Sequence, residues 1–191
     1  YGTDDWKHPA FNDNTWAPDP AINPNGAQGP LAGRLANAVT GIPTPNTILN
    51  IGPFGRAYPT VYFRKDFQVA DAINIPELIF NIIRDDAMIV YLNGREIHRD
   101  NFTNPVVNYS DFGPADSESE PVIFNYALAP GELQEGTNTI AVELHNFSAG
   151  NSDLGIQMSV IERKNALGGN VVNLTQTGIV KSRTLSNGEW S

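Results

Sequence analysis

The sequence predicts an all-β fold in the form of a β-sandwich, and three observations support this prediction. Segments in which apolar and polar residues alternate recur from Pro59 to Glu162, which is the pattern of half-buried strands. Long amphipathic helices are not visible. The 17 glycines and 14 prolines indicate many turns. Together these features are typical of a sandwich or jelly roll of seven or eight strands.

The length and the net charge of the chain limit the classes of protein to which it can belong. The 191 residues suffice for one large domain with its own core, and the absence of cysteine excludes disulfides. The net charge of −9 and the lack of a Lys/Arg cluster make nucleic acid an unexpected partner. No run of about 18 apolar residues occurs, so membrane insertion is not expected. Because the chain starts at Tyr1 without a signal-peptide pattern, we interpret it as a mature or excised part of a longer protein.

The N-terminal third differs from the rest of the chain. Residues 1–58 are rich in Pro, Asn, Gly and Asp, and turn-forming residues dominate between 21 and 55. We interpret this region as a long irregular covering segment, with one short helix expected over the sequence GRLANAV. Trp6 and Trp16 are expected to fill the core rather than to bind a ligand.

The first predicted strand covers residues 60–69, with the sequence TVYFRKDFQV. Its apolar residues alternate with polar ones and are predicted to face the core. They are Val61, Phe63, Phe67 and Val69. The next segment, ELIFNIIR, is more apolar and is predicted to be a more central strand.

A hairpin and three further strands complete the predicted sheets. Asn93 and Gly94 separate the strand-like segments 89–92 and 96–99, and an Asn-Gly pair in such a context predicts a tight hairpin. In the sequence EGTNTIAVEL, Gly136 and Asn138 are expected to reverse the chain before a buried strand. Residues 101–120 form a polar, acidic loop in this interpretation. The remaining strands are predicted at 121–128, 138–147 and 153–162.

We expect two units along the chain. Residues 1–163 form the sandwich, and residues 164–191 form a strand-like extension or a linker. After Gly168 and Gly169 the extension has two weak strand-like pieces, at 171–174 and 178–185. It could pack back as an edge strand, begin another domain, or pair with another molecule.

Several motifs in the central region resemble the galactose-binding-like superfamily. In order they read VYFRKDFQV, DDAMIVYLNGREIHRDN, EGTNTIAVELHN and AVELHNFSAGNSDLGIQM, and the opening WKHPAFNDNTW is similar to a first strand of such domains. The resemblance covers about residues 1–160, with Ala87 in place of a usual glycine, and extends to the sugar-binding domains of β-galactosidase-type hydrolases and to accessory modules of secreted bacterial proteins. It implies a galactose-binding-like jelly roll. It also implies a non-catalytic carbohydrate-binding or adhesive module of a secreted or cell-surface protein, with a polysaccharide or glycan as its partner.

Enzyme motifs are missing from the sequence. It has no GxSxG, P-loop or GxGxxG motif, and its three histidines do not have metal-ligand spacing. We therefore expect no catalysis. A glycosidase is the weaker alternative, because Asp85, Asp86, Glu143 and Asp153 could supply a pair of carboxyl groups.

Sugar binding requires aromatic side chains for the apolar face of the ring and polar groups for the hydroxyls. Jelly-roll modules of this kind present both from their loops, which indicates the candidate ligand-binding residues. These are Asp85, Asp86, Arg99, Tyr109, Phe112, His145 and Asp153. Structural roles compete for some of them. Asp85 and Asp86 could accept backbone N–H groups and fix a loop, and His145, oriented by Glu143 on the same strand face, could be a structural histidine.

Two further expectations concern an ion and an alternative function. If the chain holds an ion, the resemblance implies a structural calcium, for which Asp4, Asp5, Asp13 and the stretch DSESE offer oxygen atoms without EF-hand spacing. The alternative function is a structural subunit of an extracellular fibre or surface assembly. In that case the extension 164–191 would contact identical subunits or neighbouring domains.

Overall fold

The computed structural model describes residues 4–12, 55–117, 122–151, 153–164, 185–186 and 189–190. Strands dominate this part of the chain, and its two helices are short 3-10 turns. The elements are η1 (Asp4–Lys7), β1 (Thr60–Val69), η2 (Ala72–Asn74), β2 (Glu77–Asp85), β3 (Ala87–Leu92), β4 (Arg95–Asp100), β5 (Val122–Ala127), β6 (Gly136–His145), β7 (Gly155–Arg163), β8 (Leu185–Ser186) and β9 (Glu189–Trp190).

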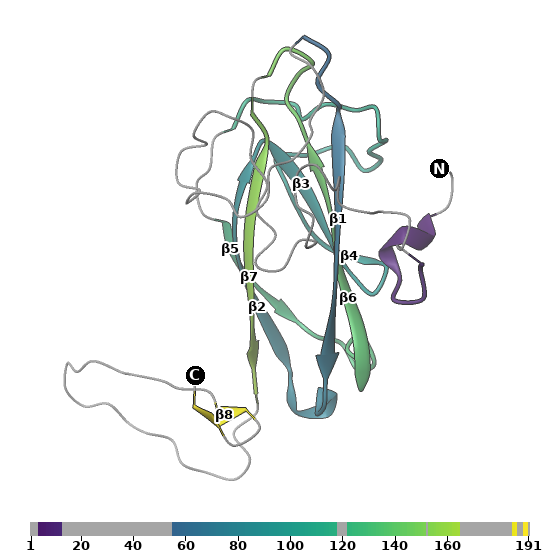
Figure 1. Cartoon of the computed structure of the whole chain (residues 1–191), viewed down its shortest axis with the longest axis vertical. Helices are drawn as coiled ribbons and strands as arrows, with labels where there is room; N and C mark the ends of the chain where they lie inside the picture. The colour runs from purple at the N-terminus through teal and green to yellow at the C-terminus, as the bar shows by residue number, and fades with distance from the viewer. Residues whose placement is uncertain are drawn as a thin grey trace, which may run out of the picture.

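Strands β1 to β7 form two antiparallel sheets that pack face to face (Figure 1). One sheet has the order β1-β6-β3-β4 and is called the four-stranded sheet below. The other has the order β5-β2-β7 and is called the three-stranded sheet. The predicted all-β sandwich is therefore confirmed, whereas the jelly-roll assignment stays a prediction. The central position predicted for the segment ELIFNIIR is confirmed, since β2 lies between β5 and β7.

The main core lies between the two sheets. The four apolar residues predicted to face the core from β1 contribute to it, and Phe80 and Ile82 of β2 are fully buried against the opposite sheet. From the four-stranded sheet the core receives Val61, Phe63, Phe67, Val69, Met88, Val90, Leu92, Ile140, Val142 and Leu144. Removing this apolar surface from water is the main driving force for the packing of the two sheets.

The predicted Asn-Gly hairpin joins β3 to β4. Asn93 and Gly94 have φ angles of 50° and 91°, which are left-handed values that favour these two residue types. A side chain at Gly94 would also collide with His8, because an added Cβ would lie 2.1 Å from the imidazole ring. Glycine is thus required here both by the backbone conformation and by the close approach of the N-terminal segment.

The turn before β6 also follows the prediction. Gly136 has a φ of 89°. Asn138 is fully buried, and its side-chain amide donates to the carbonyl oxygen of Gln134 at 2.7 Å while its side-chain oxygen accepts the N–H of Gln134 at 2.9 Å. The two residues close the turn as expected.

The described residues of the opening segment, 4–12, do not form the expected strand, and residues 13–16 lie outside the described part of the chain. Asp4–Lys7 form the 3-10 helix η1, and Pro9, which has no N–H to donate to a ladder, follows two residues later. Trp6 packs on the outer face of the four-stranded sheet, with its ring 4.7 Å from the ring of Tyr62 and 5.8 Å from that of Tyr91. It therefore belongs to a second, smaller apolar cluster and not to the main core.

Several predictions concern residues outside the described part of the chain. They include the helix over GRLANAV, the packing of Trp16, the role of Asp13 and the strand-like piece 171–174. Of the extension 164–191, the structure describes Lys164 and a short ladder between β8 and β9. The boundary at residue 163 stays a prediction. No described helix is long and apolar enough to cross a membrane.

Candidate functional site

The loop end of the sandwich brings together residues 55–60, 101–117 and 146–153, at the top of Figure 1. Three backbone hydrogen bonds join these segments. Ala57 donates to the carbonyl of Ala149 at 3.0 Å, and Asn146 donates to the carbonyl of Pro59 at 2.8 Å. Gly113 donates to the carbonyl of Asn146 at 2.8 Å. The loop end is therefore a connected surface and not a set of independent loops.

Asp86 anchors this end from beneath. Its carboxylate is fully buried and accepts the N–H of Phe147 at 2.7 Å, the N–H of Ser117 at 3.2 Å and the side-chain amide of Asn151 at 2.9 Å. One side chain thus fixes two different loops. The predicted structural role of an Asp at this point, accepting backbone N–H groups, is confirmed for Asp86.

Asp85 lies beside Asp86 and is held in a different way. It is also buried, and one of its carboxyl oxygens has no hydrogen-bond partner. Burial, and then the charge of Asp86, raises the pKa of Asp85 to about 8. Arg84 does not neutralise the pair, because its guanidinium donates to Asp100 at 2.6 Å. Asp85 therefore keeps its proton at neutral pH, and the two side chains form an acid–carboxylate pair.

A second buried carboxyl group, Glu143, lies on the outer face of the four-stranded sheet. Tyr91 donates its hydroxyl to Glu143 at 2.6 Å, and His145 Nε2 lies 3.2 Å from the other carboxyl oxygen. The ammonium of Lys7 lies 3.9 Å from Glu143 and 4.2 Å from the centre of the Tyr91 ring. The predicted contact between Glu143 and His145 is confirmed. Burial and the hydrogen bond to Glu143 raise the pKa of the Tyr91 hydroxyl. Burial, and then the charge of Glu143, raises the pKa of Tyr62 to about 12.

His145 connects this buried group to the loops. Its Nδ1 lies 2.8 Å from the carbonyl oxygen of Asp111 and 2.9 Å from the hydroxyl of Thr60, which itself donates to the carbonyl of Tyr109 at 2.7 Å. Since a carbonyl can only accept, Nδ1 carries a proton. His145 therefore holds the segment 109–111 against the sheet, and no part of its side chain is exposed.

Three aromatic side chains are exposed above these anchors. We call Tyr58, Tyr109 and Phe147 the aromatic surface; their exposed fractions are 50%, 71% and 37%. Tyr58 precedes β1 and Phe147 follows β6, each two residues beyond the end of its strand. The two strands are paired up to Thr60 and His145, and the backbone hydrogen bond from Asn146 to Pro59 extends this pairing by one residue. The chain thus places all three at the loop end, although they come from three separate segments.

Tyr109 stands at the tip of a closed turn. Asp111 donates its N–H to the carbonyl of Asn108 at 2.9 Å, and its carboxylate accepts the N–H of Asn108 at 2.7 Å. The turn is fixed to β1 by the hydroxyl of Thr60 and to β6 by His145. An exposed ring on a turn with this many bonds has little freedom to lose when it contacts a ligand.

The other predicted site residues are placed as follows. Arg99 lies on β4 and donates to Glu96 at 2.6 Å and to the carbonyl of Asn104. Phe112 is half-buried next to Gly113, and Asp153 is half-buried and close enough for its charge to contribute to the raised pKa of Asp85. The structure thus brings Tyr109, Phe112 and His145 together, with Asp85, Asp86 and Asp153 beneath or beside them. Ligand contact by any of them stays a prediction.

Sequence reasoning missed Tyr58 and Phe147. Phe147 follows directly after the recognisable β6 motif, and Tyr58 precedes the first strand by two residues, so both occupy strand ends where loops begin. That position was the available signal, because exposed aromatic residues at strand ends are candidates for ligand contact.

The described residues do not fit a metal ion. No group of three His, Cys, Asp or Glu side chains among them could hold one. The carboxylate of Asp86 is already engaged by three N–H donors, and Asp116 and Ser117 are the described part of the DSESE stretch. The calcium expectation therefore gains no ligand set from the described chain.

Comparisons with known proteins give structural similarities of low score. No family model matches the chain, and no curated protein matches it. A β-glucuronidase from Ruminococcus gnavus is 14% identical over 56% of this chain, with a TM-score of 0.34. A β-glycosidase from Bacteroides vulgatus is 18% identical over 55% (TM-score 0.32), and an α-L-rhamnosidase from Aspergillus terreus is 17% identical over 57% (TM-score 0.36). The matches cover between 12% and 18% of those chains. At these scores the similarities carry no argument about family or activity.

Proposed function

We propose that this protein is a non-catalytic carbohydrate-binding module of a secreted or cell-surface protein and that the aromatic surface is where the glycan binds. The observation that carries the proposal is the exposure of Tyr58, Tyr109 and Phe147 at one end of a rigid sandwich. Exposed apolar patches on a protein surface often mark interaction sites. Their flat apolar faces suit the C–H face of a sugar ring.

The anchors beneath the surface support this assignment. Asp86 holds the backbone of Phe147, and Thr60 and His145 hold the turn that carries Tyr109. A site whose support is fixed before binding loses less conformational entropy when the ligand arrives. The exposed side chain of Asn108, next to Tyr109, can contribute polar contacts to hydroxyl groups.

Charge favours a neutral glycan over an anionic one. The chain has a net charge of −9, and the carboxylate of Asp111 lies in the turn that presents Tyr109. Uronates or sulfated sugars would meet repulsion here unless a cation intervened. We therefore expect uncharged polysaccharides to bind and polyanionic ones to bind more weakly.

Equilibrium binding to a panel of neutral and acidic polysaccharides tests the proposal. Tyr109→Ala and Phe147→Ala should each weaken binding about tenfold, which corresponds to roughly 1.4 kcal/mol. Ile161→Ala is the matched control, because Ile161 is 60% exposed but lies on the outer face of the three-stranded sheet. If no polysaccharide binds at millimolar concentration, or if the control weakens binding as much, the proposal is wrong.

The absence of catalysis has its own support and its own test. Asp85 belongs to the three-stranded sheet and Glu143 to the four-stranded sheet, and both side chains are buried and engaged within the protein. A glycosidase needs two carboxyl groups that flank a sugar in an open cleft. Incubation with the bound polysaccharide should release no reducing ends. Release that disappears in both Asp85→Asn and Glu143→Gln would establish a glycosidase instead.

A further inference from the structure

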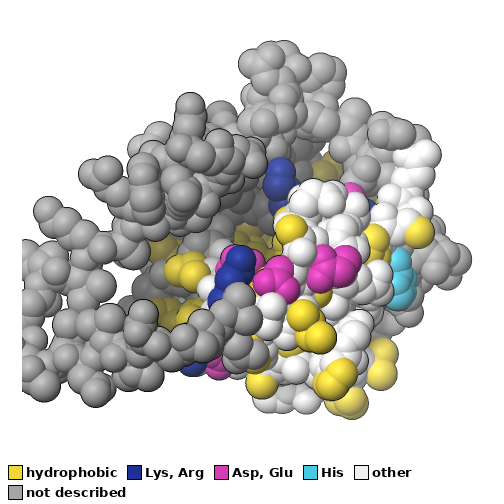
Figure 2. Space-filling model, turned by 90° about the horizontal axis from the view of Figure 1, so that it is seen from below, with side chains coloured by type: hydrophobic (Ala, Val, Ile, Leu, Met, Phe, Trp, Pro, Cys, Tyr) yellow, Lys and Arg dark blue, Asp and Glu magenta, His cyan; other side chains and the backbone are white. Residues whose placement is uncertain are grey.

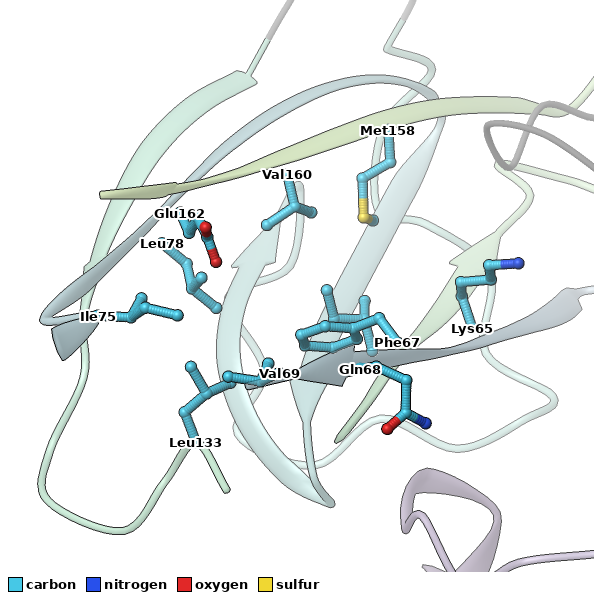
Figure 3. Close-up of a pocket in the computed structure, with 11 residues that line it drawn as sticks. Lys65, Phe67, Gln68, Val69, Ile75, Leu78, Leu133, Met158, Val160 and Glu162 are labelled. Atoms are coloured by element: carbon cyan, nitrogen blue, oxygen red, sulfur yellow. The ribbon is translucent and has the colours of Figure 1, made fainter. Parts of the chain in front are cut away.

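The two sheets differ by one strand in the described part of the chain, and a groove runs along one side of the sandwich. On the opposite side, His98 of β4 stacks on Phe124 of β5, with the ring centres 3.9 Å apart, and the two rings fill the space between the sheets. On the grooved side, β1 and β7 flank a hollow of about 360 Å³ (Figure 3). Small-molecule sites usually measure about 300 to 1,000 Å³, so this groove is large enough for one small ligand.

The walls of the groove are apolar. Figure 3 shows Phe67 and Val69 of β1 facing Met158 and Val160 of β7 across it. Phe67 and Val160 are half-buried, so part of the apolar surface of the main core stays in contact with water. A ligand with an apolar body would remove this surface from water. The remaining apolar lining residues are Ile75, Leu78, Leu133 and Ile140.

One end of the groove carries a positive charge. Lys65 occupies the inner face of β1, since Phe63 and Phe67, two residues before and after it, both contact the main core. Its side chain is exposed and lines the end of the groove (Figure 3). No described acidic residue forms an ion pair with it. An ammonium group at the margin of an apolar surface is complementary to a ligand with a negatively charged end.

The other end of the groove is acidic. Glu162 lies near Ile75 at this end in Figure 3, and its carboxylate pairs with the ammonium of Lys164 at 2.9 Å. From here Ile75 and Leu133 continue into a second hollow, which Glu135 also lines. Figure 2, which views the molecule from below, shows hydrophobic side chains around a group of acidic ones. The apolar surface thus continues at this end, whereas an anionic group of a ligand would be repelled here.

We infer that the groove binds a single-chain amphiphile with a carboxylate head, such as a medium-chain fatty acid. The carboxylate pairs with Lys65, and the alkyl chain lies between β1 and β7 with its end toward Ile75. The charges at the two ends of the groove fix this direction. The four residues from Lys65 to Val69 span about 13 Å in an extended strand, which the alkyl chain of decanoate matches.

A free amphiphile fits the groove better than a membrane does. The apolar surface lies between two strands, so a single chain can enter it and a flat bilayer cannot cover it. The net charge of −9 also opposes contact with an anionic bilayer.

The groove is separate from the aromatic surface. β1 begins with Thr60 at the loop end, and Lys65 lies five residues farther along the strand, which is about 17 Å. The inference therefore does not depend on glycan binding, and a failure of either proposal leaves the other in place.

The two methionines of the chain provide a direct test by methyl NMR. Met158 lines the groove, whereas Met88 is fully buried in the main core. Titration of the ¹³C-methyl-methionine protein with decanoate, below its critical micelle concentration, should shift the Met158 signal to saturation and leave the Met88 signal in place. Met158→Leu assigns the two signals. The expected dissociation constant is about 0.1 mM for a ligand of this size.

Lys65→Gln tests the position of the carboxylate. Octanoate and octan-1-ol have alkyl chains of similar length and differ mainly in charge. The substitution should weaken octanoate binding about threefold, because an exposed ion pair contributes little, and should leave octan-1-ol binding unchanged. An equal loss for both ligands, or no loss for octanoate, would place the carboxylate elsewhere and overturn the inference.

Two neighbouring substitutions in β7 test the position of the alkyl chain. Val160→Phe fills the groove with a larger side chain and should weaken decanoate binding at least tenfold. Ile161→Phe is the matched control, because Ile161 is 60% exposed on the outer face of the same strand, and it should bind decanoate like the natural protein. An unchanged Met88 signal verifies that each variant is folded. Equal affinities of the two variants would show that decanoate binds outside the groove.

Four other results would also overturn the inference. An unchanged Met158 signal at millimolar decanoate would mean that the groove takes no amphiphile. Equal shifts of both methionine signals would mean that decanoate loosens the core. A Met158 shift with anionic phospholipid vesicles and none with decanoate would identify a membrane-binding surface. Self-association of Lys65→Gln in light scattering, with normal octanoate binding, would show that Lys65 protects the edge of β1 from pairing with another molecule.

Discussion

Buried carboxyl groups occur at two places among the described residues, the Asp85–Asp86 pair and Glu143, and these places differ in what compensates the burial. Glu143 is surrounded by donors from side chains, namely the hydroxyl of Tyr91, the imidazole of His145 and the nearby ammonium of Lys7. The Asp pair has only amide donors around Asp86 and a shared proton between the two residues.

This difference predicts how the stability of each region responds to substitution and to a change in pH. A buried carboxylate with a cation beside it remains charged, and the loss of the carboxylate leaves that cation uncompensated. A buried pair of acids without a cation lowers its energy by keeping one proton, and it becomes sensitive to alkaline pH. The substitutions below break or sharpen this comparison, and they are ordered from the largest expected effect to the smallest.

Glu143→Ala should have the largest effect on stability. It removes the acceptor of Tyr91 and the carboxylate that Lys7 and His145 contact, so the free energy of unfolding should fall by about 3 kcal/mol. Urea denaturation at pH 7 measures the change. Glu162→Ala is the control, because Glu162 pairs with Lys164 at the surface and its loss should reduce stability by less than about 1 kcal/mol. Equal losses of stability in the two variants would show that Glu143 and its contacts stabilise the fold no more than a surface ion pair does.

Asp86→Ala should destabilise the loop end by about 2 kcal/mol. It leaves three donors, those of Ser117, Phe147 and Asn151, without their acceptor, but these are neutral amides in two loops that can reach water. Hydrogen exchange should accelerate at Ser117 and Phe147 and stay unchanged at the Asn93 hairpin. Uniform acceleration across both ends would mean that Asp86 supports the whole fold instead.

Asp85→Asn should flatten the pH dependence of stability. The pKa of Asp85 is about 8 in the folded protein against 3.8 as the ordinary value, so between pH 4 and pH 8 the folded state binds more protons than the unfolded state. The stability contributed by the protonated group is therefore present at low pH and is lost as pH rises toward 8. The amide of Asn keeps a donor for Asp86 and has no proton to lose.

Denaturation midpoints at pH 5 and pH 8 check this expectation. The natural protein should lose more stability between the two values than Asp85→Asn does, and at pH 8 the variant should be at least as stable. If the denaturation midpoint of Asp85→Asn changed between pH 5 and pH 8 as much as that of the natural protein, Asp85 would be ionised throughout this range.

Tyr91→Phe should have the smallest effect, about 1 kcal/mol, because it removes one hydrogen bond while Lys7 and His145 still face Glu143. Thermal denaturation is sensitive enough to measure it. A loss as large as that of Glu143→Ala would mean that the tyrosine, and not the charge balance, holds this region together.

Much of the fold was visible in the sequence because its signals are local. The alternation over residues 60–69 depends only on neighbours in the chain, and the Asn93 and Gly94 pair specifies its own turn through positive φ angles. For residues 4–12 of the opening segment the expected strand was wrong. Their sequence is similar to a first strand, but Asp4–Lys7 form a 3-10 helix and Pro9 has no N–H to donate to a ladder.

The candidate site was only partly visible because it depends on distant contacts. Tyr109 is held by Thr60, 49 residues earlier, and Thr60 contacts His145, 85 residues later. The sequence identified Tyr109 as exposed on a loop but could not show that Tyr58 and Phe147 reach the same end. It also could not separate exposed residues from anchors, since the burial of Asp85 and His145 arises only when the loops are assembled.

Calorimetric titration of a bound polysaccharide into three proteins tests the central claim, that the exposed aromatic surface binds the glycan while the buried acids position the loops. The natural protein, Tyr109→Ala and Asp85→Asn are compared at pH 6, where Asp85 is protonated. We expect about a tenfold weaker affinity for Tyr109→Ala with an unchanged denaturation midpoint, and an unchanged affinity for Asp85→Asn. Loss of binding in folded Asp85→Asn, together with normal binding by Tyr109→Ala, would contradict the account and assign ligand contact to the buried pair.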